Sequence, residues 1–278
     1  MKALITGGKG FVGPYLKREL ENNGYSVVVS DLKDSDYDCD ITNKEKVFSM
    51  ISSIKPDYVF HLAGFSSVSK SFENPSLCFK INIDGTKNLL EACLDVKKVL
   101  IVSSAEVYGK PEYVPIDEKH PLNPVSPYGK SRVEQEKIAL NFSNVVISRS
   151  FNHTGEGQPS TFVIPSFKNQ INEAKNGDTI YVGNLEVIRD FSDVKDVVHA
   201  YRILLEKGVL GEIYNVGSGV GVKLKDILNK LILESGKDLK VEVDSNKYRK
   251  ADIVELVANV SKINELGIKI HSFNLSSY

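Results

Sequence analysis

A glycine-rich turn close to the start of the chain constrains the fold more than any other feature. The apolar run Ala3–Thr6 predicts a strand, and Gly7, Gly10 and Gly13 follow it at the start of a helical pattern over Phe11–Asn23. Glycines at this spacing let the chain turn sharply from strand to helix and let backbone approach a pyrophosphate at the helix N-terminus. The turn therefore predicts the first βαβ unit of a dinucleotide-binding fold, with Phe11 and Val12 beside the cofactor.

Short apolar runs continue to alternate with helical patterns through the first half of the chain. This rhythm is typical of a parallel sheet covered by helices on both faces. We therefore predict an α/β fold, a Rossmann-type doubly wound parallel sheet with a smaller, discontinuous C-terminal substrate domain. The predicted strands are Ser26–Ser30, Tyr58–Leu62, Val99–Ser103, Val145–Ser148 and Glu212–Val216, and the predicted helices are Lys44–Ser53, Pro75–Leu94, Ser126–Asn141, Val194–Leu205 and Lys223–Ser235.

After Arg149 the regular alternation ends, which suggests where the second domain begins. The segment His153–Pro165 is rich in Gly, Pro, Ser and Thr, as expected of an irregular loop that contributes to a site. We assign residues 1–151 and 191–217 to the dinucleotide-binding domain. Residues 152–190 and 218–278 are assigned to the second domain, which is predicted to bind substrate.

An acidic residue at the end of the second strand bears on the choice of cofactor. Asp31 follows Gly13 by 18 positions (31 − 13), where a carboxylate accepts hydrogen bonds from the adenosine ribose and repels a 2′-phosphate. This favours NAD(H) over NADP(H), which stays the alternative; a turn-initiating Asp is the plainer interpretation. Further predicted cofactor contacts are Asp40 and Ile41 at the adenine, and Leu62, Ala63 and Gly64 after the third predicted strand.

The segment around Tyr128 carries the chemistry. Ser126 and Pro127 suit a helix N-terminus, and Tyr128 and Arg132 then lie four positions apart on one helical face. A fixed cation beside a phenol favours the phenolate, which helps a tyrosine exchange protons near neutral pH. Ser104 is a candidate partner of Tyr128. The plainer alternatives are that Ser104 caps the end of its strand and that Arg132 pairs with Glu136 on the surface.

Composition excludes several other classes of function. The formal net charge is −1, so no bulk attraction to nucleic acid or to an anionic membrane is expected. No apolar run reaches membrane-spanning length, and the first strand starts directly after Met1, so we expect a cytoplasmic protein. The three cysteines and five histidines are scattered, and we assign no metal site.

Together these motifs resemble those of the extended short-chain dehydrogenases/reductases that act on nucleotide sugars. The resemblance runs from Thr6 to about Leu266. The loop after Phe151 and the later Gly211–Gly219 most resemble the GDP-4-dehydro-6-deoxy-D-mannose reductases. The other matching segments are Thr6–Gly13, His61–Gly64, Asn82–Thr86, Ser103–Gly109, Ser126–Ser131, Arg149–Gly155 and Arg189–Asp193.

The resemblance implies a role for each matching residue. Tyr128 is the implied general acid–base, Ser104 binds the reacting oxygen, and Arg132 occupies the place of a lysine that holds the nicotinamide ribose. Asn82 and Phe151 are implied to lie at the cofactor. The implied substrate contacts are Ser104, Glu106, Asn152, Phe162, Val163, Lys168, Arg189, which would clamp the diphosphate, and Arg249, which would hold the nucleotide end.

The activity that the resemblance implies is reduction of a 4-keto-6-deoxy nucleotide sugar. The preferred reaction is GDP-4-dehydro-6-deoxy-D-mannose to GDP-D-rhamnose, with hydride from the nicotinamide and a proton from Tyr128. A nucleotide-sugar 4-epimerase or 4,6-dehydratase is the first alternative, and a non-catalytic NAD or nucleotide-sugar binding protein is the second. In similar proteins, helices corresponding to Pro75–Leu94 and Ser126–Asn141 form a homodimer, which we expect here.

Overall fold

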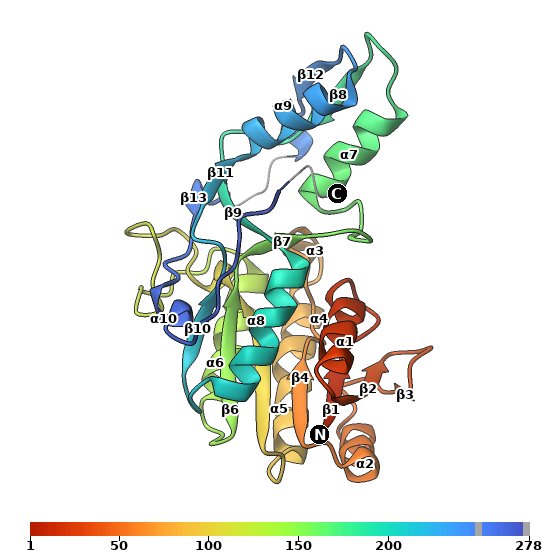
Figure 1. Ribbon diagram of the computed structural model, residues 1–278, viewed down its shortest axis with the longest axis vertical. Helices are drawn as coiled ribbons and strands as arrows, with labels where there is room; N and C mark the ends of the chain where they lie inside the picture. The colour runs from red at the N-terminus through yellow and green to blue at the C-terminus, as the bar shows by residue number, and fades with distance from the viewer. Residues whose placement is uncertain (248–251, 275–278) are drawn as a thin grey trace.

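A parallel sheet forms the centre of the larger lobe of the protein. In the computed structural model, which describes residues 1–247 and 252–274, seven strands pair in parallel throughout (Figure 1). In spatial order they are β10 (Ile213–Val216), β6 (Val145–Ser150), β5 (Lys98–Ser104), β4 (Tyr58–His61), β1 (Lys2–Thr6), β2 (Ser26–Asp31) and β3 (Tyr37–Asp38). Because β2 and β4 flank β1 on opposite sides, the strand order reverses at β1, where α/β sheets bind their ligands.

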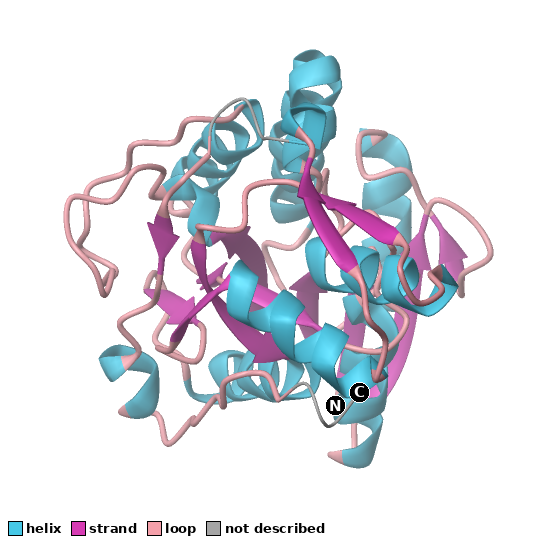
Figure 2. Ribbon diagram, turned by 90° about the horizontal axis from the view of Figure 1, so that it is seen from above, coloured by secondary structure: helices cyan, strands magenta, loops and turns pink. Residues whose placement is uncertain are grey.

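Helices cover both faces of this sheet (Figure 2). One face carries α1 (Val12–Asn22) and α8 (Val194–Lys207), and the other carries α2 (Lys44–Ile54), α5 (Gly85–Ala92) and α6 (Pro127–Ala139). The remaining elements of this lobe are α3 (Val68–Glu73), α4 (Pro75–Phe79), the π-helical segment η1 (Lys80–Asp84) and the 3₁₀ turn η2 (Ala105–Val107).

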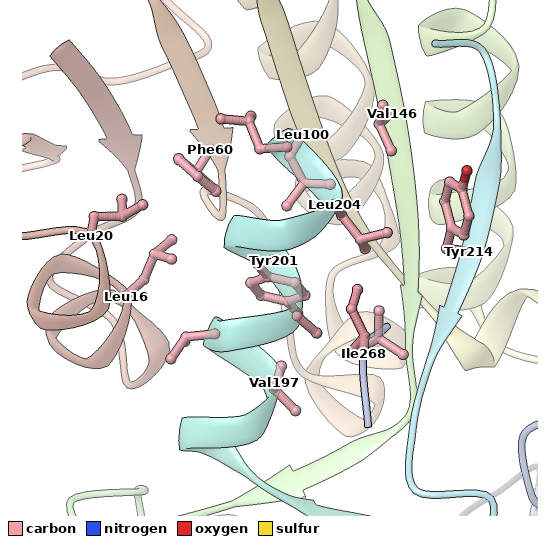
Figure 3. Close-up of a cluster of buried hydrophobic side chains, with 14 of the residues drawn as sticks. Leu16, Leu20, Phe60, Leu100, Val146, Val197, Tyr201, Leu204, Tyr214 and Ile268 are labelled. Atoms are coloured by element: carbon pink, nitrogen blue, oxygen red, sulfur yellow. The ribbon is translucent and has the colours of Figure 1, made fainter. Parts of the chain in front are cut away.

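The strands are apolar at successive positions because each face of the sheet is buried. In β1, Ala3 and Ile5 belong to the cluster under α1 and α8, whereas Leu4 belongs to the cluster under α2 and α5. Figure 3 shows the first cluster, with Val197, Tyr201 and Leu204 of α8 directed toward side chains of the central strands. This packing holds the carboxyl ends of the strands in a fixed arrangement, on which the site is built.

A smaller lobe lies at the far end of the molecule from the N-terminus (Figure 1). Its apolar cluster lies mainly between α7 (Val163–Glu173) and α9 (Leu224–Ser235). Two small sheets accompany it, one with order β11-β9-β13 and β7 paired to β9, the other formed by β12 and β8. These elements are β7 (Asn152–Thr154), β8 (Thr179–Val182), β9 (Ile188–Asp193), β11 (Gly221–Lys223), β12 (Lys240–Val243), η3 (Ser245–Lys247) and β13 (Glu255–Leu256).

The predicted parallel sheet is confirmed, but two local predictions differ from the structure. The helix predicted over Pro75–Leu94 is present over Pro75–Ala92, but it is not α-helical throughout, because a π-helical segment joins α4 to α5. The domain boundary at residue 190 falls inside β9, and Ile263 of α10 (Ser261–Asn264), with Ile268, packs in the cluster under α8. Ile263 and Ile268, which fall in the range assigned above to the second domain, thus contribute to the core of the larger lobe.

Candidate active site

The glycine turn lies where the strand order reverses. Gly7 has φ +70°, and a Cβ atom there would lie 2.5 Å from the backbone nitrogen of Ala63 in the segment after β4. A Cβ atom on Gly13 would lie 2.1 Å from the carbonyl oxygen of Gly8. Side chains at these positions would therefore collide with backbone, so the tight turn depends on glycine. The predicted grouping of the glycine turn with Leu62–Gly64 is present in the structure.

The N-terminus of α1 keeps donors that suit a phosphate. Phe11 stands at the N-cap position and supplies no side-chain hydrogen bond to the first turn. Asp31, at the end of β2, accepts from the backbone N–H of Lys9 at 2.8 Å and of Leu32 at 2.8 Å. The Asp31 carboxylate thus holds the glycine turn through Lys9 and also accepts from the next residue of its own segment, Leu32. This geometry fits a dinucleotide, with the pyrophosphate at α1 and the ribose at Asp31.

The predicted adenine residues occupy different environments. Asp40 is exposed and accepts from both the N–H and the hydroxyl of Thr42, at 2.9 and 2.8 Å. Ile41 is buried, and a Cβ atom on Gly85 would lie 2.5 Å from its Cδ1 atom. Ile41 therefore packs the start of α5 against the segment before α2. An adenine contact for either residue stays a prediction.

Tyr128 and Arg132 are brought together as predicted. Ser126 caps α6 by accepting from the N–H of Gly129 at 3.0 Å, and Pro127 is the first residue of the helix. One turn on, the Arg132 guanidinium carbon lies 5.2 Å from the centre of the Tyr128 ring, and both residues are buried. Lys130 is exposed, so it is not the cation beside the phenol. The pair can place a fixed positive charge against a tyrosine that exchanges protons.

Neutral oxygens surround the Arg132 guanidinium. Nη1 donates to the carbonyl of Val102 at 3.1 Å and to Oε1 of Gln135 at 2.8 Å, and Nη2 donates to the carbonyl of Phe65 at 3.4 Å. Within the described residues, Nε has no hydrogen-bond partner although it is buried. A buried donor without a partner is costly, so Nε is a candidate to bind a ligand oxygen such as a ribose hydroxyl.

Gly64 makes room for this cation. A Cβ atom on Gly64 would lie 2.8 Å from Nη2 of Arg132 and 2.9 Å from Oδ1 of Asn82. Asn82, fully buried in the π-helical segment, accepts from the N–H of Phe65 at 2.7 Å and donates to Ser131 at 2.8 Å. The amide of Asn82 therefore joins the segment after β4 to α6. π-Helical insertions of this kind are frequent at functional sites.

Ser104 and Glu106 lie at the carboxyl end of β5, where η2 packs against α6. The Ser104 hydroxyl oxygen accepts from the N–H of Glu106 at 3.2 Å, so Ser104 caps η2 as well as ending the strand. A Cβ atom on Gly129 would lie 2.6 Å from the carbonyl oxygen of Glu106. The glycine next to Tyr128 thus lets α6 approach this turn, which brings the candidate catalytic residues onto adjacent segments.

The pairing of Arg132 with Glu136, considered above as an alternative, is wrong. Glu136 is buried and binds Arg149 of β6, with a distance of 2.7 Å between Arg149 Nη2 and Glu136 Oε2. Ser103 donates to the same carboxylate at 2.5 Å. This ion pair fastens α6 to the ends of β5 and β6. Sequence reasoning missed it, although Glu136 shares a helical face with Arg132.

The segment after β6 lies close to the start of α1. Phe151 is buried, with its N–H donating to Val216 at 2.8 Å, and Asn152 begins β7. His153 stacks on Phe11 with ring centres 6.2 Å apart, and burial lowers the pKa of its imidazole. The irregular loop therefore contacts the helix of the glycine turn, as a loop that contributes to the cofactor site should.

The remaining predicted substrate residues belong to the smaller lobe. Arg189 is buried in β9, where Nη1 donates to the carbonyl of Ile188 at 2.8 Å and Nη2 lies 3.4 Å from Oδ1 of Asp252. Phe162 and Val163 begin α7, and burial lowers the pKa of Lys168 on the same helix. Arg249 lies outside the described residues. The structure places these residues in one lobe, while their roles stay predictions.

The fold and the site define a class of protein: a Rossmann-type enzyme with a dinucleotide turn and a tyrosine–cation pair. The sequence model of the GDP-mannose 4,6 dehydratase family matches residues 4–271, and the chain belongs to this family. Family membership confirms the predicted fold, the resemblance to nucleotide-sugar short-chain dehydrogenases/reductases and the assignment as an enzyme.

Named relatives span more than one activity. The chain is 33% identical over 265 residues to GDP-6-deoxy-D-mannose reductase of Pseudomonas aeruginosa, covering 90% of this chain and 86% of that protein. RMD from Pseudomonas aeruginosa, solved with NADPH, superposes with a TM-score of 0.86 at 30% identity, covering 97% and 93%. UDP-glucose 4-epimerase of Thermus thermophilus, solved with NAD, gives a TM-score of 0.86 at 29% identity, covering 97% and 94%.

The two solved neighbours agree with the predicted cofactor class, because one contains NAD and the other NADPH. Within the described residues, no helix is both long and apolar enough to cross a membrane.

Proposed function

We propose that this enzyme reduces a 4-keto-6-deoxy nucleotide sugar, converting GDP-4-dehydro-6-deoxy-D-mannose to GDP-D-rhamnose. The observation that carries the proposal is the position of Arg132. Its guanidinium carbon lies 5.2 Å from the centre of the Tyr128 ring, and its Nη2 lies beside Gly64, in the segment that packs against the glycine turn. The named GDP-6-deoxy-D-mannose reductase supports the choice of a GDP-linked substrate. The substrate contacts assigned to Phe162, Val163, Lys168, Arg189 and Arg249 are part of the same proposal.

A reduced nicotinamide, when bound, supplies the hydride that the sugar carbonyl receives at C4. Tyr128 donates its phenolic proton to the carbonyl oxygen, so that a secondary alcohol forms. Ser104 orients that oxygen with its hydroxyl hydrogen, because the hydroxyl oxygen already accepts from Glu106. The positive charge of Arg132 stabilises the phenolate left on Tyr128, and its Nε–H is available for the nicotinamide ribose.

A 4-epimerase is the second candidate, supported by the likeness to a UDP-glucose 4-epimerase. Dehydration is disfavoured because Glu106 is the one acidic residue of η2, whereas elimination of water needs a second acid–base group beside it. Consumption of reduced nicotinamide separates the first two activities. A reductase oxidises one NADH for each sugar reduced, whereas an epimerase leaves the total unchanged.

The deciding experiment follows NADH absorbance with GDP-4-dehydro-6-deoxy-D-mannose as substrate and compares Tyr128→Phe with the unaltered enzyme. We expect this change to lower kcat by about 10²- to 10⁴-fold, because the proton donor is lost, while NADH still binds. The matched control is Tyr181→Phe, at an exposed tyrosine of β8, which should retain full turnover. Full turnover by Tyr128→Phe would eliminate the proposed proton donor.

We propose NAD(H) as the preferred cofactor because the Asp31 carboxylate lies at the glycine turn. Replacing it in Asp31→Ser should raise the preference for NADPH relative to NADH by about tenfold, since a charge that repels a 2′-phosphate is removed. The ratio of kcat/KM values for the two cofactors measures this. Glu21→Gln removes one charge from an exposed part of α1 and should leave the ratio unchanged.

We also propose a cytoplasmic homodimer that pairs the surfaces of α4, α5 and α6. Exposed leucines on and next to these helices support an interface: Leu77, Leu94 and Leu140. Sedimentation of the purified protein tests the dimer, and a monomer at assay concentration would contradict it. The two-domain division is likewise retained as a proposal, with residues 258–270 moved to the larger lobe because they pack there.

A further inference from the structure

A continuous chain of buried hydrogen bonds leads from the glycine turn to Arg132. Thr6, the last residue of β1, lies 2.7 Å from Nδ1 of His61, and Nε2 of His61 lies 3.0 Å from Oγ1 of Thr86. Thr86 accepts from Nε2 of Gln135 at 2.7 Å, and Oε1 of Gln135 accepts from Arg132 at 2.8 Å. The chain thus joins β1, β4, α5 and α6 through side chains alone.

Gln135 has a fixed orientation in this chain. Its carbonyl oxygen faces a cation and its amide nitrogen faces a hydroxyl, so a flip of the amide would place donor against donor at Arg132. Gln135, Thr86 and Thr6 have no exposed surface, and His61 is 1% exposed. Water therefore cannot replace a lost partner without rearrangement, and each bond in the chain constrains the next.

The surroundings of Arg132 match a guanidinium better than an ammonium. Nη1 divides its two hydrogens between Val102 and Gln135, while Nη2 reaches Phe65 through the space that Gly64 leaves. A lysine ammonium is a single nitrogen and lacks this planar fork. Both Nη atoms are held, and Nε is the donor of this guanidinium that has no partner in the described part of the chain. The position of that donor is thus set by the acceptors on the outer nitrogens.

We propose that Gln135 is a positioning residue that fixes Arg132 for cofactor binding and proton transfer, with Thr86, His61 and Thr6 holding Gln135 in turn. The inference rests on the proposed function, because it takes Arg132 as the cation that serves the nicotinamide ribose and Tyr128. It explains how an arginine serves where relatives of the resembled family use lysine: the acceptor on the next turn of α6 completes its coordination.

The test uses two substitutions of one side chain in the full-length protein. Gln135→Met keeps the volume and removes both hydrogen bonds, whereas Gln135→Glu keeps an acceptor for Arg132. We expect Gln135→Met to weaken NADH binding by about tenfold and to lower kcat by about 10²-fold, because the guanidinium is released. Gln135→Glu should bind NADH within about threefold of the unaltered protein. Lys137→Met, at an exposed position of α6, is the matched control.

A merely structural role for Gln135 would not produce two further results. First, the basic limb of the pH dependence of kcat should move to higher pH in Gln135→Met, because less positive charge is held at Tyr128. Second, in a double-mutant cycle on NADH affinity, Gln135→Met should cost less than about twofold once Arg132→Met is present. Additive losses, or an unchanged affinity and pH profile in Gln135→Met, would overturn the inference.

The failure of this inference differs from failure of the proposed function. NADH titration by fluorescence needs no sugar, so the double-mutant cycle still tests the role of Gln135 if the keto sugar is not turned over. Absence of turnover would overturn only the proposed substrate. If neither NADH nor NADPH binds the unaltered protein, the inference and the proposed function are both overturned.

Discussion

Two buried arginines of this enzyme lie in opposite electrostatic settings. Arg149 faces the Glu136 carboxylate through three short contacts of 2.7 to 3.2 Å and also donates to the hydroxyl of Tyr108 at 3.1 Å. Among the described residues, Arg132, four positions before Glu136 on α6, meets only neutral oxygens and one aromatic ring, and its Nε is without a partner.

This difference separates a charge used for structure from a charge kept for chemistry. A buried cation paired with a carboxylate projects little field, and its removal leaves the partner charged and unpaired. A cation among neutral acceptors still exerts its electrostatic field on neighbouring groups, and it can keep an N–H donor for a ligand. Because Glu136 binds Arg149 and not Arg132, the positive charge of Arg132 is not neutralised.

The largest expected effect is on stability, through Arg149→Met. We expect the free energy of unfolding to fall by about 3–5 kcal/mol, because Glu136 is left as a buried charge without its partner. Urea denaturation measures the loss. The double change Arg149→Met with Glu136→Met removes both charges and should regain most of that stability. If the double variant is no more stable than the single one, packing rather than the unpaired charge caused the loss.

Arg132→Met should have a smaller effect on stability. It leaves the acceptors of Val102, Phe65 and Gln135 unmatched but no charge unpaired, so we expect a loss of about 1–3 kcal/mol in the same denaturation experiment. Its main cost should appear in turnover and NADH binding. A loss of stability equal to that of Arg149→Met would show that the Arg132 charge is structural too.

The effect that is smallest at neutral pH concerns His61 and the pH dependence of stability. Burial, and then the positive charge of Arg132, lower the pKa of His61 to about 3. Because histidine in the unfolded chain titrates near 6.5, the unfolded state binds the extra proton below that pH, and stability is lost as the pH falls from about 6.5 toward 3. This contribution is absent above about pH 7.

The slope expected from His61 is about 1.4 kcal/mol for each pH unit below 6. Denaturation of His61→Asn over the same pH range should show a slope lower by that amount. Thr86→Val breaks the same hydrogen-bond chain without removing the imidazole, so it should keep the slope of the unaltered protein. Equal slopes for His61→Asn and the unaltered protein would mean that His61 is protonated in the folded state.

The local sequence pattern was sufficient to predict the parallel sheet, the glycine turn and the helix that begins next to Tyr128. Apolar runs such as Val27–Val29 lie inside strands, and Ser126 caps α6 where the sequence places the cap. Such features depend on residues within a few positions of each other, or on burial that a periodic pattern reports directly. The π-helical segment around Asn82 escaped prediction because its sequence is compatible with an ordinary helix.

Residue types alone thus determined that this chain is a dinucleotide-binding α/β protein with a tyrosine and a cation one helical turn apart. Which of the two arginines meets a carboxylate was decided only in three dimensions. Arg149 comes to Glu136 because β6 lies beside β5, and Gln135 comes to Thr86 because α5 packs on α6. The buried charge of Arg149 is tolerated because the fold brings Glu136 to it, and such contacts between residues on different elements are a property of the whole fold.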